Sequence, residues 1–209
     1  QGTLYGRNTT GGAISFVTKR PTNALSAGVT AEYATFDALQ VEAYVSGPIT
    51  ETLKGRLAAM TQQGGAFQHN RVTGESLGDA DRTGVRGLLV YEPNERLSFT
   101  LDAHGGIDKS ENEGLYLLSP LVTRGGRTGS VTIPADKDHR ATGWGLSPRF
   151  AAEMGRNVNA KPGRDNSSWG TSLNGHYDFD AMRLTSITSY ETLDRSEYGD
   201  WDATSSVEA

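Results

Sequence analysis

Residues 1–21 read QGTLYGRNTTGGAISFVTKRP, and this stretch decides how the rest of the chain is interpreted. Its first half, Gly2 to Gly12, is rich in Gly, Thr and Asn, which favour tight turns and positive φ angles. From Ala13 to Lys19 the side chains alternate, which predicts a short strand entered through a glycine turn. Pro21 ends that strand, because proline has no backbone N–H to donate.

The spacing of two glycines in this stretch also suggests a phosphate-binding loop. Such a loop needs Lys and then Ser or Thr after its second glycine, and this chain has Gly12 and Ala13 at those places. Without the ammonium and the hydroxyl, nothing reaches the β- and γ-phosphates or their metal ion. The pattern therefore disfavours phosphate binding and leaves a plain glycine-rich loop before a strand as the simple alternative.

The order of these residues resembles the end of the plug domain of TonB-dependent outer-membrane receptors. The resemblance is carried by QGTLYGR, by the following GGAI and by VTKRP. The residues that match the motif are Gly2, Leu4, Tyr5, Gly6, Arg7, Gly11, Gly12 and Ile14. In that family the segment is the last plug strand before the chain enters a barrel. The resemblance thus implies the end of a plug domain over residues 1–22 and the first part of a β-barrel over residues 23–209.

The rest of the chain supports this reading, because it alternates as half-apolar strands do. The alternating runs are 24–34, 39–47, 53–62, 83–91, 97–104, 169–177 and, less regularly, 183–194, where Ile187 interrupts the polar side. Each run has about the 9–11 residues that a tilted membrane strand needs. One side of each run is apolar and the other carries ionisable groups, as in a barrel with a wet interior. We predict an all-β fold: a partial antiparallel transmembrane β-barrel of about seven meandering strands, preceded by the last strand of a plug.

The predicted connections fall into two classes of length. Three are short, at 50–52, 93–96 and 178–181, and two are long and polar, at 63–81 and 105–168. Short periplasmic turns and long extracellular loops are typical of outer-membrane barrels. We expect the two long loops to lie at one end of the sheet and the stretch 105–168 to be irregular. Three alternatives remain: a passive porin, a barrel-anchored surface protein and a soluble β-sandwich that binds a ligand.

The aromatic residues give a second test of the barrel. Tyr91, Phe99 and Tyr177 fall on apolar sides near the short turns, whereas Tyr33 and Trp169 fall on apolar sides near the long loops. Two such belts are typical of membrane interfaces.

Composition narrows the class of protein. The 209 residues carry a net charge of −5 and no long basic run, which disfavours a nucleic-acid surface. The chain has no cysteine, so disulfides and thiolate metal sites are excluded. No apolar run approaches the ~20 residues of a membrane helix. The chain starts inside a motif, without a signal peptide, and ends in a polar segment, so we expect a fragment of a longer protein of the bacterial outer membrane.

The sequence predicts no enzyme, no cofactor and no catalytic or metal site. The four histidines, His69, His104, His139 and His176, lie on separate predicted elements, and none has a second ligand at a rigid spacing. The run Asp136–His139 has the side chains to hold a cation in a loop, but the pattern favours a plain solvated loop. No nucleophile elbow or zinc helix is found.

Two groups of residues are candidates for function. Phe67, His69, Tyr116 and Trp144 are bulky amphipathic residues of the long loops, so we expect them to contact a ligand. Charges on the polar sides of the strands should face the lumen and contact the plug, with Arg7 and Arg20 as possible partners. These charges are Glu32, Glu42, Lys54, Arg56, Arg86 and Asp102.

The resemblance also implies a function. Receptors of this family take up a large, scarce ligand through a plugged barrel, and the periplasmic protein TonB drives uptake with an inner-membrane motor. A ferric siderophore is the usual ligand, and cobalamin and sugars are others. The expected partners are therefore TonB with its motor, outer-membrane lipid and an extracellular small molecule, and no nucleic acid.

Overall fold

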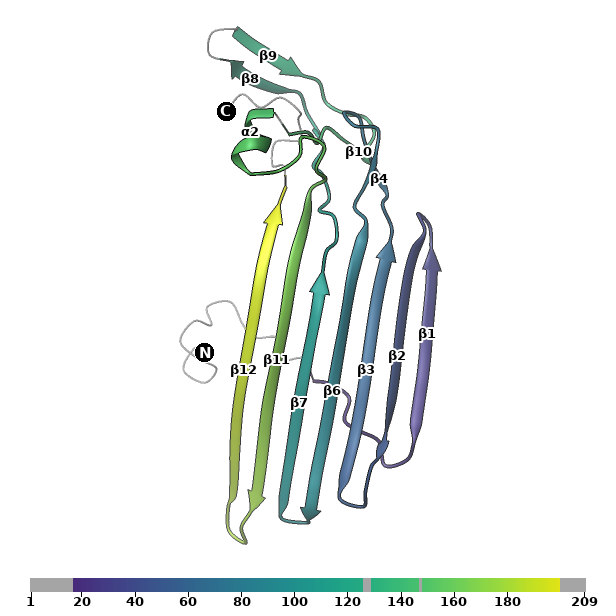
Figure 1. Ribbon diagram of the computed structural model, residues 1–209, viewed down its shortest axis with the longest axis vertical. Coiled ribbons are helices and arrows are strands. Elements are labelled where there is room, and N and C mark those ends of the chain that lie inside the picture. The colour runs from purple at the N-terminus through teal and green to yellow at the C-terminus, as the bar shows by residue number, and fades with distance from the viewer. Residues whose placement is uncertain (1–16, 126–128, 147, 200–209) are drawn as a thin grey trace.

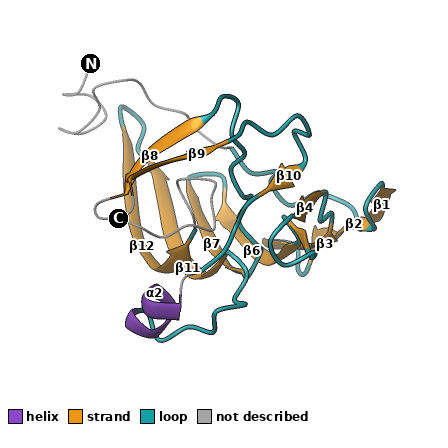
Figure 2. Cartoon of the chain, turned by 90° about the horizontal axis from the view of Figure 1, so that it is seen from above, coloured by secondary structure: helices purple, strands orange, loops and turns teal. Residues whose placement is uncertain are grey.

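One seven-stranded antiparallel sheet dominates the computed structural model (Figure 1), which describes residues 17–125, 129–146 and 148–199. Its strands lie side by side in the order β1-β2-β3-β6-β7-β11-β12, so each long strand pairs with the next one along the chain. Their bounds are β1 (Ser26–Ala34), β2 (Ala38–Pro48), β3 (Leu53–Gly64), β6 (Ala80–Asn94), β7 (Leu97–Asp108), β11 (Gly163–Asp178) and β12 (Arg183–Tyr198). Seen from above, the strands follow an arc (Figure 2). The prediction of an all-β fold with seven meandering antiparallel strands is confirmed, and the sheet is consistent with part of a barrel.

The smaller elements lie beyond one end of this sheet (Figure 1). A three-stranded sheet joins β10 (Ala141–Thr142), β4 (Gln68–Asn70) and β5 (Ser76–Leu77), in that order. A separate hairpin pairs β8 (Leu121–Gly125) with β9 (Gly129–Ile133), and a short helix, α2 (Pro148–Glu153), follows.

The prediction that 105–168 is irregular is therefore wrong. Strand β7 continues to Asp108, β11 begins at Gly163, and the loop between them contains β8, β9, β10 and α2. The pattern was hidden because Gly105 and Gly106 carry no side chain to alternate. The first residues of β11, from Arg164 to Ser168, have polar side chains on both faces.

Both long loops lie at the same end of the sheet, as predicted, because the strands between them are antiparallel. The short turn between β1 and β2 is also at this end, which we call the loop end. Here Phe36 and Asp37 adopt positive φ angles of 63° and 57°. The Gly65 N–H donates to the Phe36 carbonyl over 2.9 Å, and Gly64 (φ 82°) is needed because a Cβ there would overlap the Asp37 carbonyl. The other three short connections lie at the opposite end, the turn end.

The strand register separates two faces. One row across the sheet aligns Val45, Leu57, Gly87 and Ala103. These residues, with every second residue along each strand from them, form the apolar face. Adjacent residues point to the opposite side, which we call the polar face. The large side chains of the apolar face are exposed, for example Val29 (74%), Leu57 (53%) and Leu173 (45%). On the polar face, Ile187 aligns with Asn174, so it does interrupt the polar pattern as the sequence indicated.

Aromatic side chains mark both ends of the apolar face. Tyr91 aligns with Phe99 near the turn end, and Tyr177 lies beside Leu97 there. Tyr33 and Trp169 lie near the loop end, where the Trp169 ring is 5.2 Å from that of Tyr190. The placement of the aromatics agrees with the two predicted belts.

The segment before β1 crosses the polar face at the turn end. Thr22 donates its N–H to the Ser46 hydroxyl over 2.9 Å, and the Arg20 guanidinium lies 3.5 Å from the Glu92 carboxylate. Residues 13–16 of the predicted plug strand lie outside the described residues. Residues 17–19 are not part of a strand, so that part of the prediction is wrong: the segment is anchored through side chains rather than through a backbone ladder. The division into a plug end (1–22) and a barrel part (23–209) stays a prediction.

Candidate functional site

The two long loops, 65–79 and 109–162, are joined through their described residues into one body, which we call the loop cap. Strand β10 pairs in parallel with β4, aligning Ala141 with His69. The Gln68 side chain completes the join: its Nε2 donates to the Gly114 carbonyl and its Oε1 accepts the Gly114 N–H, both over 2.8 Å. Gln68 is 5% exposed, so these bonds satisfy buried groups that water cannot reach. The loops are therefore coupled through buried hydrogen bonds.

A second set of buried polar residues strengthens this join. Asn70 is 1% exposed, donates to the Trp144 carbonyl over 2.9 Å and accepts the Val72 N–H over 2.9 Å. Thr142 donates its hydroxyl to the Leu115 carbonyl over 2.9 Å. Gly114 must lack a side chain, because a Cβ there would overlap the Thr142 hydroxyl. Each polar side chain thus fixes the backbone of a distant segment.

Trp144 attaches the cap to the sheet. It is 3% exposed, and its indole N–H donates to the Ala160 carbonyl over 3.0 Å. Its ring centroid lies 6.4 Å from that of Tyr198, the last residue of β12. The Arg156 guanidinium stacks on the Tyr198 ring at 4.3 Å. Trp144 was predicted to contact ligand, but the structure places it inside the cap, where any effect on ligand would act through packing.

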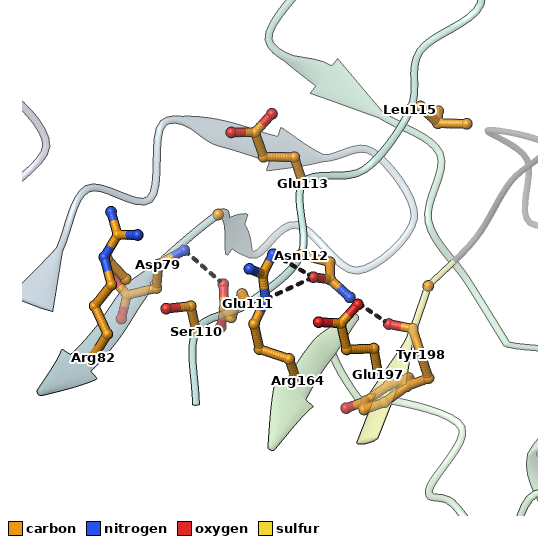
Figure 3. A pocket seen from close by; sticks show the side chains of 13 residues that line it. Asp79, Arg82, Ser110, Glu111, Asn112, Glu113, Leu115, Arg164, Glu197 and Tyr198 are labelled. Carbon is orange, nitrogen blue, oxygen red and sulfur yellow. Dashed lines mark hydrogen bonds between the residues drawn. The ribbon is translucent and has the colours of Figure 1, made fainter. Parts of the chain in front are cut away.

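A cavity of about 510 Å³ lies where the cap meets the ends of β6, β11 and β12 (Figure 3). Asn112 is its central residue. The Arg164 guanidinium donates to Asn112 Oδ1 over 2.6 and 3.0 Å, and Asn112 Nδ2 donates to the Tyr198 carbonyl over 2.8 Å. The same amide lies 3.2 Å from the Gly163 carbonyl. One loop residue therefore holds the loop-end termini of β11 and β12 together.

Several charges at this cavity are paired. Lys161 Nζ lies 2.7 Å from the Glu111 carboxylate, and this hydrogen bond raises the pKa of Lys161. Glu111 also accepts the Asp79 N–H over 3.2 Å, and Arg164 lies 3.5 Å from Asp108. The lining thus carries both signs of charge and offers donors and acceptors together. The lining has more carboxylates than guanidinium groups, and such a lining suits a polar ligand that is recognised by hydrogen bonds.

The outer part of the cap is fixed by an ion pair between the two loops. Arg71 donates to both carboxylate oxygens of Asp136 over 2.5 and 2.9 Å. This contact is the main reason that the pKa of Asp136 is lowered to about 2. Asp138 accepts the Arg140 N–H, which lowers its pKa, and it lies 3.7 Å from His69. In the run Asp136–His139, both carboxylates therefore have partners within the cap.

On the polar face, a chain of charged side chains crosses four strands. Arg86 lies 3.7 Å from Asp102, and Asp102 lies 2.8 Å from His104 Nδ1. His104 Nε2 lies 3.2 Å from the Glu191 carboxylate, which reaches it across β11. Gly170 makes this possible, because a Cβ there would overlap the Glu191 carboxylate. With a carboxylate at each ring nitrogen, His104 donates to both only as the imidazolium.

All the predicted lumen charges lie on this polar face. Beyond the chain just described, Arg56 stacks on the Tyr44 ring at 4.1 Å, and Glu42 accepts a hydrogen bond from Gln40 over 2.9 Å. Glu32 is in register with Gln40, and Lys54 pairs with Glu92 at 3.2 Å. The partner of Arg20 is therefore Glu92, which was not among the predicted charges. Arg7 and the motif residues from Gly2 to Ile14 lie outside the described residues, so contact with a plug stays a prediction.

The other predicted ligand residues are in the cap but do not line the cavity of Figure 3. Phe67 is half-buried with its ring 6.5 Å from that of Phe36, Tyr116 is half-buried, and the His69 side chain is 45% exposed. Sequence reasoning missed Glu111, Asn112 and Arg164. No alternation marked Arg164, because residues 164–168 are polar at every position, and it lay in the stretch 105–168 that was predicted to be irregular.

Within the described part of the chain, no group of three or more His, Asp or Glu side chains could hold a metal ion. None of the described helices is long and apolar enough to cross a membrane.

Comparison with known proteins does not assign the chain to a family. No family model matches the chain, and no curated protein matches it. Among solved structures, the chain is similar to a chain of the structure described as the FpvAI–pyocin S2 complex, with a TM-score of 0.44 and 17% identity. The match covers 84% of this chain and 29% of that chain, so this chain spans less than a third of its neighbour. A likeness of this size carries no conclusion about function.

Proposed function

We propose that this chain is part of a TonB-dependent receptor of the bacterial outer membrane. Its activity is the TonB-energised uptake of a large, scarce nutrient, with a ferric siderophore as the favoured ligand. The observation that carries the proposal is the sheet, which has one exposed apolar face and one charged face. The sequence motif in residues 1–21 supports the same family.

The exposed apolar face is the physical reason for a membrane. Val29, Leu57 and Leu173 stand on it at 45–74% exposure, together with many neighbours. Large apolar patches on soluble proteins are rare because water contact is costly, whereas lipid removes that cost. Within lipid, every backbone group of a strand must also be paired. The edges β1 and β12 would therefore need further strands of the longer protein to close a barrel.

The three alternatives are disfavoured for two different reasons. A β-sandwich needs a second sheet packed on the first, and the smaller sheets of the described residues lie beyond the loop end instead (Figure 1). A passive porin or a barrel-anchored surface protein would have the same two-faced sheet. What favours gated uptake over these is the plug-like motif in residues 1–21.

The loop cap is the proposed ligand-contacting region. It lies at the end that is extracellular if the short turns face the periplasm. Its cavity around Asn112 and its half-exposed side chains, such as His69, offer polar contacts. Because the two loops are one body, the ligand would meet a preformed surface.

The test uses the full-length protein in a Gram-negative host. We expect it in the outer-membrane fraction, and we expect uptake of a panel of ferric siderophores only when TonB is present. Replacing both loops, 65–79 and 109–162, by short turns should abolish uptake and leave the barrel inserted. Uptake that is equal with and without TonB would favour a porin, and a soluble periplasmic protein would exclude the barrel.

A further inference from the structure

We propose that the apolar face carries a binding groove for one acyl chain of a phospholipid. This inference rests on the proposed membrane location. It concerns a specific depression in the face, not the general contact of a barrel with lipid.

The groove has a volume of about 430 Å³ and lies across β2, β3, β6 and β7. Its floor is made by residues of the apolar face that have at most a methyl side chain: Gly55, Gly87 and Ala103. Its walls are branched apolar side chains: Val45, Leu57, Leu89 and Leu101. The volume is within the range of roughly 300–1,000 Å³ that is usual for sites of small molecules.

The groove is closed at the turn end and open in the middle of the sheet. Ile49, in the turn after β2, folds back over Gly55, so that a Cβ there would meet its Cδ1 at 3.0 Å. At Gly87 the nearest atom to an added Cβ would be the Ala103 carbonyl oxygen at 4.0 Å. Space above Gly87 is therefore free, and side chains surround it on several sides.

A second apolar hollow, of about 310 Å³, extends the track toward the loop end. It lies across β6, β7 and β11, and is lined by Val85, Gly105, Ile107 and Trp169. Along β6 and β7, which border both hollows, the second hollow follows the first. The shape thus fits a slender, elongated occupant, whereas a flat protein partner would use the whole face.

The chemistry of the lining selects the occupant. No charged side chain of the apolar face borders the groove. Arg56 and Ser46 border it from the other face, where Arg56 stacks on Tyr44 and Ser46 bonds to Thr22. Nothing in the groove can hold a headgroup, so recognition is of the hydrocarbon alone. At the turn end, which is periplasmic in the proposed orientation, phospholipid of the inner leaflet supplies that chain.

The experiment counts phospholipids bound to the full-length receptor by native mass spectrometry. The protein is extracted in mild detergent and exchanged with phosphatidylethanolamine vesicles. Gly87→Leu places a side chain on the floor and should remove one bound phospholipid per chain. Thr171→Leu is the matched control, because Thr171 lies on the same face and in the same row beyond Ala103. It should retain the wild-type number.

Each outcome decides the proposal. Equal retention by wild type and Gly87→Leu would exclude the groove while leaving the membrane location intact. A change of oligomeric mass in Gly87→Leu would show that a second copy of the chain occupies it. Absence of the wild type from the membrane fraction would overturn the groove and the proposed function together. If Gly87→Leu does not insert, Ala103→Leu on the adjacent strand fills the same floor and gives the answer.

Discussion

The loop cap and the sheet distribute their apolar side chains in opposite ways. In the cap, Leu77 is 1% exposed and Trp144 is 3% exposed, as in the core of a soluble protein. On the apolar face of the sheet, Val29 is 74% exposed and Leu184 is 59% exposed. The cap is thus stabilised by removal of apolar surface from water, and the sheet mainly by its hydrogen-bonded ladders. The difference is the one that the proposed membrane location requires, with the cap in water and the apolar face of the sheet in lipid.

Polar groups differ between the two regions as well. The cap buries Gln68 and Asn70 and gives each its own backbone partners. On the polar face of the sheet, Arg86 and Asp102 lie 3.7 Å apart and stay partly exposed. Loss of a partner therefore leaves a buried group unsatisfied in the cap, whereas water replaces the partner on the sheet. Four predictions test this contrast, from the largest expected effect to the smallest.

Trp144→Ala should destabilise the cap by about 3–5 kcal/mol, because it removes a buried aromatic side chain and leaves a cavity. Hydrogen exchange of the full-length protein should show lost protection in residues 65–79 and 109–162, with β2 and β3 unchanged. Leu118→Ala, at a residue 81% exposed, is the control and should change stability by less than about 0.5 kcal/mol. Equal loss of protection in β2 would mean that cap and sheet are one cooperative unit.

If the apolar face contacts lipid as proposed, Leu173→Arg should destabilise the inserted protein by about 2–4 kcal/mol, because it places a charge in the hydrocarbon. Ser172→Arg changes the adjacent residue, whose side chain lies on the polar face in register with Asp102. That variant should be within about 0.5 kcal/mol of wild type. Denaturant unfolding from phospholipid vesicles measures both. Similar destabilisation by the two variants would contradict the assignment of the faces.

Gln68→Ala should cost about 1–3 kcal/mol, because the Gly114 N–H and carbonyl lose their partner in a buried place. Gln40→Ala is the same substitution on the polar face, where Gln40 bonds to the exposed Glu42. It should cost less than about 0.5 kcal/mol. Local hydrogen exchange near each site gives the comparison. A larger effect at Gln40 than at Gln68 would reverse the roles given to cap and sheet.

The ion pair between Arg71 and Asp136 should make the cap sensitive to acid. The pKa of Asp136 is lowered from 3.8 to about 2 in the folded protein, so its stabilising contribution is complete above the unfolded value. That contribution is lost as the pH falls through about 2. Amide protection of β4, corrected for intrinsic exchange, should decrease over this window in wild type. Asp136→Asn should lack this pH dependence, and an unchanged pH profile in that variant would assign it to another group.

The sequence predicted the sheet better than the cap, and the physical reason differs for each. Within the apolar face alternation is obligatory, so the runs 39–47 and 83–91 identified β2 and β6. Near the loop end the side chains of β11 are polar on both faces. Its start at Gly163 therefore shows no apolar–polar alternation by which the strand could be recognised. The cap depends on contacts between distant residues, such as Asn70 with Trp144, 74 positions apart. Trp144 was chosen as a ligand residue for its size, and the same size makes it a core residue.

The bond between Gln68 and Gly114 has a consequence for exchanging loops between related proteins. Residues 65–79 and 109–162 are separate in the sequence but form one transferable module. A graft of either loop alone would leave the buried hydrogen-bonding groups of Gln68 or of Gly114 without their partners. A graft of both loops would join the sheet at the loop-end termini of β3, β6, β7 and β11. The register of these strands is fixed by their own backbone pairing within the sheet. Chimeras that carry a new ligand specificity should therefore be built by moving the two segments as a pair.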